Sequence, residues 1–231
     1  MAKKNLKGNE LINISPRCEI IEKGQKGPVP DTSKRISPLK YNTHKNDHRP
    51  VSFLTESEVF SMEDAVRPNR NGDRDALFIE VSFKCCLRVS EVLGLTPSCR
   101  GKVDNNYVLL IKNGKGCKPR LLGIGQPLYD KLSGYAYDRK LGPEDKYFKF
   151  SRFRALQIIK VAAVKAGIDS RRVYCHLLRH SGAVNRLKKT GNIQSLKTYL
   201  GHTDHKMTER YLVTLQTIES IEIEGAVKFD R

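Results

Sequence analysis

Residues 176–211 read HLLRHSGAVNRLKKTGNIQSLKTYLGHTDHKMTERY. Apolar residues recur in this stretch at helical spacing, and a glycine stands where each of the first two helices is expected to end. The pattern predicts helices at about 173–189, 193–200 and 206–213. We therefore expect this part of the chain to be helical, and it also carries polar side chains suited to phosphate chemistry.

Those polar side chains are two histidines, an arginine and a tyrosine at fixed spacing. His176 and Arg179 lie three residues apart and share one helix face. Both could contact one phosphate, to which arginine offers paired planar donors. We expect His180 to point elsewhere and to be structural. His202 follows a glycine and Tyr211 lies nine residues later, and each alone is an ordinary feature of a helical fold.

One β region interrupts the helices. Residues 107–111, YVLLI, and 120–124, RLLGI, predict two strands of an antiparallel hairpin, with Asn113-Gly114 at its turn. Helices are predicted around it, at about 55–65, 75–83, 90–94, 127–139 and 151–166. The predicted fold class is α+β, mainly helical, with one small antiparallel β-sheet.

The hairpin is strongly basic. Its four cations are Lys112, Lys115, Lys118 and Arg120, with glycines between them. A hairpin tip can bring a lysine ammonium to a phosphate from outside the main cleft. A solvated basic hairpin is the structural alternative.

Arg88 lies in LRVSEVLGL, residues 87–95, between two apolar turns. A charge in such surroundings must be paired or must face a cleft, because an unpaired buried charge is costly. An ion pair with Glu91, three residues on, is the structural alternative to a role in binding.

The composition favours an anionic partner. Among 231 residues, 42 Lys and Arg outnumber 25 Asp and Glu, for a net charge of +17, which indicates nucleic acid. A basic protein without such a partner is the alternative. No apolar run is long enough to span a membrane and the first residues do not form a secretory signal, so we expect a cytoplasmic protein. Six cysteines without a Cys-x-x-Cys motif indicate free thiols and no structural zinc.

Residues 1–50 differ from the rest of the chain. They hold five of the ten prolines and an excess of basic over acidic side chains. We expect a basic, mostly disordered extension, because it offers little apolar surface to bury. Such a segment either lies on DNA or is an unstructured leader.

Taken together and in order, four segments resemble the tyrosine recombinase (phage integrase) family over about residues 53–214. The segments are LRVSEVLGL, NGKGCKPR, HLLRHSGA and LGHTDHKMTERY. By this resemblance the six catalytic positions are Arg88, Lys115, His176, Arg179, His202 and Tyr211. For the hairpin lysine, Lys112 and Lys118 remain alternatives to Lys115.

The resemblance implies a site-specific DNA recombinase, of the kind carried by mobile genetic elements, that needs no cofactor, metal or ATP. It implies that Tyr211 attacks a phosphate of double-stranded DNA and forms a 3′-phosphotyrosine. The two arginines and His202 would hold the phosphate. His176 would accept or position the tyrosine proton, and Lys115 would protonate the departing 5′-oxygen.

The resemblance also implies a domain organisation and an assembly. We expect a catalytic domain at 51–214 after the extension at 1–50, and a C-terminal tail at 215–231. Family members pass such a tail to a neighbouring subunit, which implies a homo-oligomer, a tetramer on DNA. The alternative is that the apolar stripe of this region packs on its own domain; its members are Leu212, Leu215, Ile218 and Ile221.

Two departures from the family pattern stand out. Cys86 occupies a position that is usually a small residue, often glycine, and we expect little harm from it. Larger members carry a helical core-binding domain before the catalytic one, so this chain resembles the short members, Xer-type or fimbrial phase-switch recombinases. An accessory DNA-binding protein could supply the missing half of the clamp.

Rival interpretations share parts of this pattern. A type IB topoisomerase-like nicking-closing enzyme uses the same chemistry in a different assembly. A non-catalytic DNA-binding remnant is favoured by the missing domain and opposed by the six filled positions. An RNA-binding protein has little support.

Overall fold

The computed structural model describes residues 52–112, 119–201 and 206–226, all within one compact unit, Leu39–Arg231. Four predicted features lie outside these residues: the N-terminal extension at 1–50, the Asn113-Gly114 turn, Lys115 and His202. Side chains of the last helix are described from Thr208 to Ile218.

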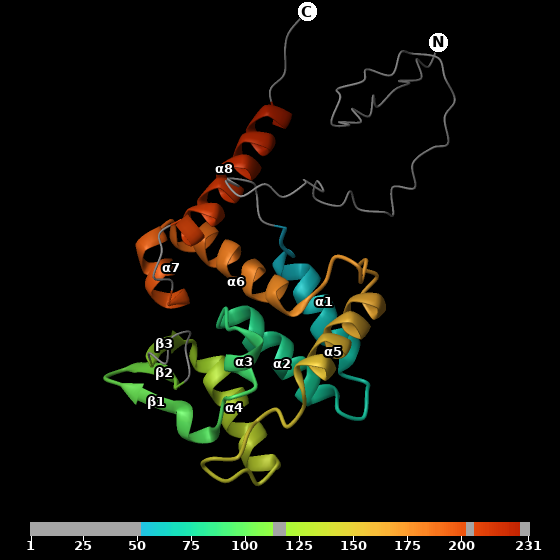
Figure 1. The fold of residues 1–231 in the computed structure, drawn as a ribbon, viewed down its shortest axis with the longest axis vertical. Helices are drawn as coiled ribbons and strands as arrows, with labels where there is room; N and C mark the ends of the chain where they lie inside the picture. Colours follow the sequence, from blue (N-terminus) through green and yellow to red (C-terminus); the bar gives the residue numbers. More distant parts are fainter. Residues whose placement is uncertain (1–51, 113–118, 202–205, 227–231) are drawn as a thin grey trace, which may run out of the picture. The chain divides into compact units, whose positions relative to one another are not determined.

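The described chain is mostly helical and carries one small antiparallel sheet (Figure 1), so the predicted fold class is confirmed. In order, the elements are α1 (Glu56–Val66), α2 (Gly72–Lys84), α3 (Val89–Val92), a 3-10 turn (Pro97–Cys99), β1 (Arg100–Val103), β2 (Asn106–Ile111), β3 (Arg120–Ile124), α4 (Gln126–Asp138), α5 (Arg152–Lys165), α6 (Cys175–Thr190), α7 (Ile193–Leu200) and α8 (Lys206–Ala226). None of the described helices is long and apolar enough to cross a membrane.

The helix ends follow from local sequence signals. The hydroxyl of Thr55 accepts a hydrogen bond from the backbone N–H of Glu58, whose carboxylate in turn accepts from the N–H of Thr55, so the two residues form a capping box. Helices α6 and α7 end at Gly191 and Gly201, whose φ angles of 63° and 64° lie in the left-handed region that glycine adopts without strain.

The sheet has three strands in the order β1-β2-β3, one more than predicted. The extra strand, β1, pairs with β2 around a two-residue turn, where Val103 faces Asn106. Its sequence, RGKV, shows no apolar alternation, and its second half is exposed. Strand β1 therefore depends on backbone pairing to β2 rather than on buried side chains, which is why the apolar pattern did not indicate it.

Two buried clusters form the core. The larger one joins α1, α2, α4 and α5 with the inner face of the sheet, and Phe78 of α2 packs edge-on against Phe148 and Phe150. The smaller one lies where α6, α7 and α8 meet, and it contains Cys86 and Tyr211. Helix α6 contacts both α2 and α8, so it links the two clusters (Figure 1).

Helix α8 is longer than the predicted 206–213 and continues without a break to Ala226. The predicted domain boundary at 214/215 therefore falls inside one helix. Leu215 is buried in the smaller cluster, whereas Leu212 is 37% exposed. Part of the predicted apolar stripe thus packs on its own domain.

A glycine sets how closely α6 approaches α2. A Cβ atom at Gly182 would overlap the backbone carbonyl oxygen of Phe83 and would lie 2.8 Å from Cys86 Sγ. Backbone cannot move aside as a flexible side chain can, so only glycine fits there.

Gly182→Ala should therefore lower the free energy of unfolding by about 3 kcal/mol, at the upper end of the usual cost of overpacking. Gly134→Ala is the matched control, because this glycine is exposed inside α4 and nothing lies within 4 Å of an added Cβ. The control should gain roughly 0.5–1 kcal/mol from its higher helix propensity. Urea denaturation measures both, and equal effects would contradict the close approach.

The core also holds a carboxyl group with an incomplete set of partners. Glu63 is 5% exposed, and its Oε1 atom has no hydrogen-bond partner among the described residues. Burial, together with the negative charge of Glu80, raises the pKa of Glu63 to about 7. Glu80 itself binds Lys84 and Lys131 at 2.6 and 2.8 Å, and those hydrogen bonds hold its pKa below the usual range despite burial.

Because Glu63 holds its proton more tightly in the folded state, stability should fall as the pH rises from about 4.5 to 7. Glu63→Gln removes the ionisable group, so the variant should be more stable than wild type by about 2–3 kcal/mol at pH 8. The difference should vanish in acid, where wild-type Glu63 is protonated in both states. Denaturation curves at several pH values check this, and parallel pH profiles would refute it.

Candidate active site

The carboxylate of Glu91 is the centre of the site. It lies in α3 with only 1% of its side chain exposed. Its oxygens accept hydrogen bonds from the backbone N–H and the Nη1 of Arg88, both at 2.9 Å. The ion pair between these two residues, given above as the structural alternative for Arg88, is therefore present.

A second arginine reaches the same carboxylate from the sheet. Arg120 of β3 donates from Nη1 and Nη2 to the two oxygens of Glu91, at 2.9 and 3.0 Å, in a bidentate pair. Burial alone would raise the pKa of Glu91. The hydrogen bonds from Arg120 and Arg88 outweigh burial and hold that pKa below its usual range. Glu91 is therefore ionised at neutral pH.

A third arginine lies deeper. Arg179 of α6 is 1% exposed, and its Nη1 is 3.7 Å from Glu91 Oε2. Its guanidinium also donates to the carbonyl oxygens of Cys86 and Leu200, at 2.6 and 2.9 Å. Burial, with the nearby charge of Arg88, lowers the pKa of Arg179 to about 10, so it keeps its positive charge at neutral pH.

The backbone bends sharply at Cys86, whose carbonyl oxygen accepts the hydrogen bond from Arg179. Cys86 has a φ angle of 50°, in the left-handed region that costs a residue with a Cβ on the order of 1–2 kcal/mol. Its side chain is fully buried, which raises the thiol pKa to about 11. The cysteine therefore fits in volume, as expected, but at a backbone cost that glycine would not have.

Tyr211 approaches the arginines from α8. It is 2% exposed, and burial raises the pKa of its phenol to about 12, although the charge of Arg179 acts in the opposite direction. Its Oη lies 2.7 Å from Nδ1 of His180, and the two rings are 5.6 Å apart. The expectation that His180 points elsewhere is therefore wrong.

His176 stands at the start of α6, beside His180. The two rings meet edge to face with their centroids 4.7 Å apart, as the four-residue spacing on a helix allows. Partial burial and the positive charges of Arg179 and Arg88 lower the pKa of His176 below its usual range. His176 is therefore neutral at physiological pH and able to accept a hydrogen bond or a proton.

The structure thus brings together four of the six predicted residues. They are Arg88, His176, Arg179 and Tyr211. Lys115 and His202, as well as the alternative Lys118, lie outside the described residues. The other alternative, Lys112, holds Glu144 at 3.2 Å and Ser98 at 3.1 Å, so its ammonium is engaged at the base of the hairpin.

Three members of the site, Arg120, Glu91 and His180, have no site role in the sequence analysis. Arg120 counts there only as one cation of a basic hairpin, and Glu91 only as a partner of Arg88. For His180, the available signal was its spacing of four residues from His176, which places both histidines on one helix face.

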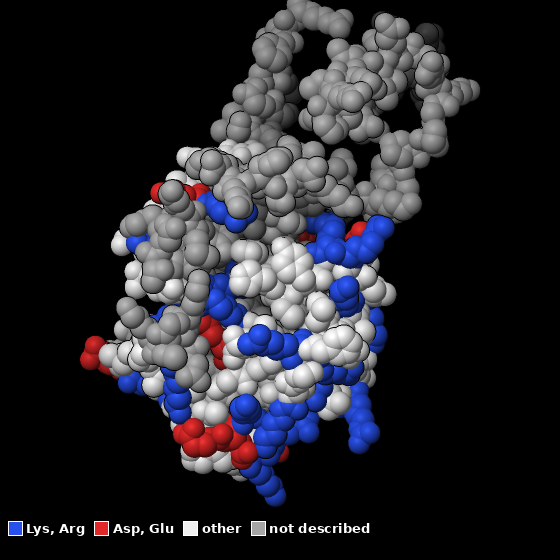
Figure 2. Space-filling model, viewed as in Figure 1, with Lys and Arg blue, Asp and Glu red and all other residues white. Residues whose placement is uncertain are grey.

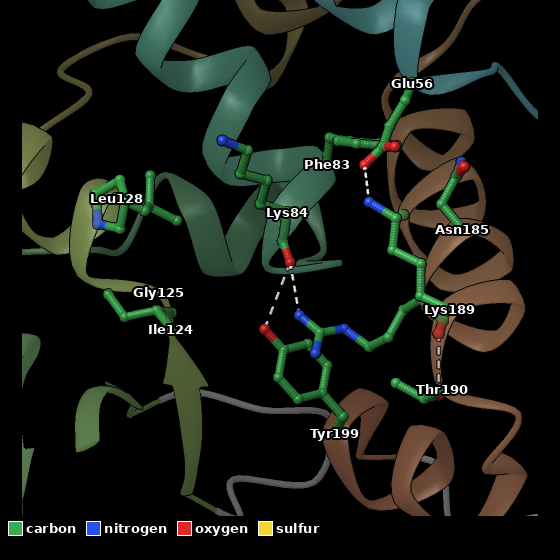
Figure 3. Close-up of a pocket in the computed structure, with 13 residues that line it drawn as sticks. Glu56, Phe83, Lys84, Ile124, Gly125, Leu128, Asn185, Lys189, Thr190 and Tyr199 are labelled. Carbon is green, nitrogen blue, oxygen red and sulfur yellow. Dashed lines mark hydrogen bonds and ion pairs between the residues drawn. The ribbon is translucent and has the colours of Figure 1, made fainter. Parts of the chain in front are cut away.

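A separate hollow of about 380 Å³ lies between the C-terminal end of α2, the start of α4, and helices α6 and α7 (Figure 3). None of the four predicted residues that the structure describes lines it. Tyr199 does, and its hydroxyl lies 3.4 Å from the carbonyl oxygens of Lys84 and Gly123 while Arg186 covers its ring at 3.8 Å. Tyr199 therefore serves packing, as a partly buried residue against both core clusters.

The described surface carries many positive charges. On the face shown in Figure 2, Lys and Arg side chains occur over much of the described surface, whereas Asp and Glu form a few small groups. Within the part of the chain that the structure describes, no three His, Cys, Asp or Glu side chains gather as metal ligands would.

Comparison with known proteins gives one family. The model of the phage integrase family matches residues 52–216. A tyrosine recombinase of Pseudothermotoga lettingae is 30% identical over 167 residues, which is 69% of this chain and 55% of the relative. Tyrosine recombinase XerD of Proteus mirabilis is 32% identical over 149 residues, 60% of this chain and 47% of the relative. The chain spans about half the length of these relatives.

Solved structures show the same fold. The XerH site-specific recombinase bound to a palindromic difH substrate, in a post-cleavage complex, superposes with a TM-score of 0.63 at 21% identity, over 75% of this chain and 53% of that one. The catalytic domain of bacteriophage HP1 integrase superposes with a TM-score of 0.56 at 25% identity, over 75% of this chain and 94% of that domain.

Glu91→Gln should lower the free energy of unfolding by about 3–5 kcal/mol, because the arginines lose their shared buried counter-charge. Since pairing lowers the pKa of Glu91, its stabilisation is complete at neutral pH and is lost as the pH falls through its folded pKa. The difference in the free energy of unfolding between wild type and Glu91→Gln should therefore become smaller in acid.

The matched control is Glu144→Gln, which removes a carboxylate that pairs with Lys112 but is 72% exposed. It should leave stability almost unchanged, because exposed ion pairs contribute little. Urea denaturation at neutral and acidic pH measures both variants. A Glu91→Gln variant as stable as the control would contradict a central role for this carboxylate.

Proposed function

The chain belongs to the phage integrase family, and from that premise we propose that it is a site-specific recombinase that cuts and rejoins double-stranded DNA through a 3′-phosphotyrosine. One observation carries the proposal. Arginines from α6 and from the start of α3 share the carboxylate of Glu91, beside a buried tyrosine. This arrangement concentrates positive charge next to a nucleophile, as attack on a phosphodiester requires.

The proposed reaction follows from the chemistry of these groups. The Oη of Tyr211 gives its proton to a neighbouring histidine and forms a bond to phosphorus, while the bond from phosphorus to the 5′-oxygen breaks. Arg88 and Arg179 stabilise the added negative charge on the nonbridging oxygens, and Glu91 keeps them in place before the substrate arrives. Lys115 gives a proton to the leaving 5′-oxygen, and His202 donates a hydrogen bond to the phosphate.

In this scheme the phosphotyrosine conserves the energy of the broken bond. A 5′-hydroxyl of another strand can then attack phosphorus and release the tyrosine, so rejoining needs no ATP. The charge that a metal ion would supply comes instead from the guanidiniums, so the proposal includes no metal and no cofactor.

The burial of Arg179 and Tyr211, at 1% and 2% exposed, bears on how DNA reaches them. A phosphate must contact both groups in the proposed transition state. We therefore expect DNA binding to be accompanied by movement of the chain segments that cover them.

The assembly is also part of the proposal. We expect residues 51–214 to act as the catalytic domain, the basic residues 1–50 to lie on DNA, and the tail at 215–231, beyond the buried Leu215, to contact a second copy. These contacts would build a homo-oligomer, a tetramer on DNA. An accessory DNA-binding protein would add further contacts with the duplex. The reaction would take place in the cytoplasm, where the substrate is.

Tyr211→Phe should abolish the covalent protein–DNA adduct, because the variant keeps the ring but lacks the attacking oxygen. The matched control is Tyr199→Phe, which removes the hydroxyl of a half-buried tyrosine that contacts only the carbonyls of Lys84 and Gly123 among described groups. The control should still form the adduct, at some cost in stability.

A nicked suicide substrate that carries the recombination site, incubated in EDTA and analysed on a denaturing gel, reveals the adduct as a slow band. Adduct formation by Tyr211→Phe would identify another nucleophile. Relaxation of supercoiled plasmid without site preference would favour the topoisomerase-like alternative, and DNA binding without any adduct would favour the non-catalytic remnant.

A further inference from the structure

The contact between His180 and Tyr211 has no assigned role in the reaction as described above. It joins Nδ1 of a histidine in the second turn of α6 to the phenol oxygen on α8 across 2.7 Å, a normal length for a strong O–H···N hydrogen bond. Both side chains are largely withdrawn from solvent, so this contact is not one of many that a mobile surface side chain would sample.

We propose that His180 is the general base that accepts the proton of Tyr211 during attack, a role that rests on the proposed function. The role falls to His180 rather than His176 because of geometry. His180 meets the phenol oxygen directly, whereas His176 contacts the ring of His180, with centroids 4.7 Å apart. His176 is then free to face the phosphate.

The proton and the bonds balance over the cycle. In the resting state the neutral ring of His180 carries its proton on Nε2, and the Tyr211 hydroxyl donates to Nδ1. As Oη bonds to phosphorus, that proton moves to Nδ1 and makes an imidazolium, while the 5′-oxygen leaves with a proton from Lys115. Rejoining reverses each transfer, so the imidazolium returns its proton to Oη as the phosphotyrosine bond breaks.

A phenol in this position needs such a base. Burial raises the pKa of Tyr211 to about 12, so at neutral pH the phenolate is a minor species. General-base catalysis typically contributes about 10²–10⁴-fold to a rate. The proposed transfer removes the need to form free phenolate before attack.

The charges around Tyr211 assist loss of its proton. Arg179, Arg210 and Arg88 all act electrostatically on Tyr211, and the thiol of Cys86 lies nearby; His202 and His205 lie outside the described residues. The three positive charges act against the effect of burial, because they stabilise the negative charge that develops on the phenol oxygen as its proton moves to His180.

The test is the single-turnover rate of adduct formation, at saturating suicide substrate, as a function of pH. His180→Ala removes the base, and we expect a rate about 100-fold lower at neutral pH. Its rate should rise about tenfold per pH unit, since hydroxide then takes the proton, while the wild-type rate levels off. His180→Asn places Oδ1 near the position of Nδ1, where it accepts a hydrogen bond but no proton, so it should stay slow.

A second substrate, with a modified leaving group, distinguishes the role of His180 as base from that of Lys115 as acid. With sulfur in place of the bridging 5′-oxygen, the leaving group needs no proton, so Lys115→Ala should recover activity. His180→Ala should not recover, because its defect is at the nucleophile. This difference places the defect of His180→Ala at the nucleophile, and the tenfold rise per pH unit then distinguishes a lost base from a merely structural role.

Asn185→Ala is the matched control, one turn further along α6, where it loses hydrogen bonds to the carbonyls of Leu54 and Ser181. It should form the adduct at the wild-type rate and with the wild-type pH profile. DNA affinity measured for every variant checks that each is folded.

Four results would overturn the inference alone, provided that wild type forms the adduct. They are a wild-type rate in His180→Ala, a wild-type rate in His180→Asn, recovery of His180→Ala by the sulfur substrate, and an equal loss in Asn185→Ala. If wild type forms no adduct on any DNA, the proposed function itself fails and the inference fails with it.

Discussion

One buried carboxylate, that of Glu91, holds the arrangement together. It binds guanidiniums from the start of α3 and from β3, and lies 3.7 Å from that of α6. Burying a carboxylate costs several kcal/mol, and arginines brought this close repel one another, so neither side would be stable without the other. This shared contact joins elements that lie far apart in sequence, and it adds a polar connection to the hydrophobic packing of the two clusters.

Much of the fold could be predicted, because the ends of helices are indicated by residues close to them in sequence. The capping box at Thr55 and the glycines after α6 and α7 are short-range signals, and the structure bears out each of them. Strand β1 could not be predicted, since its stability comes from backbone pairing with a neighbour and its side chains are polar and half-exposed. The full length of α8 was missed as well, because its apolar positions beyond Tyr211 were assigned to a tail.

The site shows the same contrast between what a local sequence pattern indicates and what depends on contacts between distant residues. Resemblance to a family pointed to Arg88, His176, Arg179 and Tyr211, which the structure places around one centre. What it could not supply was the set of contacts between distant residues. That Arg120 reaches across 29 positions to Glu91, and that a histidine of α6 meets a phenol of α8, depends on how the elements pack, and no local pattern encodes it.

Tyr211 and the chain beyond it belong to one continuous helix of 21 residues, which is about 30 Å long. A helix resists bending within a few turns, so α8 moves as one rigid rod (Figure 1). Leu215, buried one turn after Tyr211, is the point about which it would pivot. The short segment before this point carries the phenol, and the long segment after it reaches Ala226. A displacement of the far end is therefore transmitted through the helix to the phenol oxygen of Tyr211, although the two lie several turns apart.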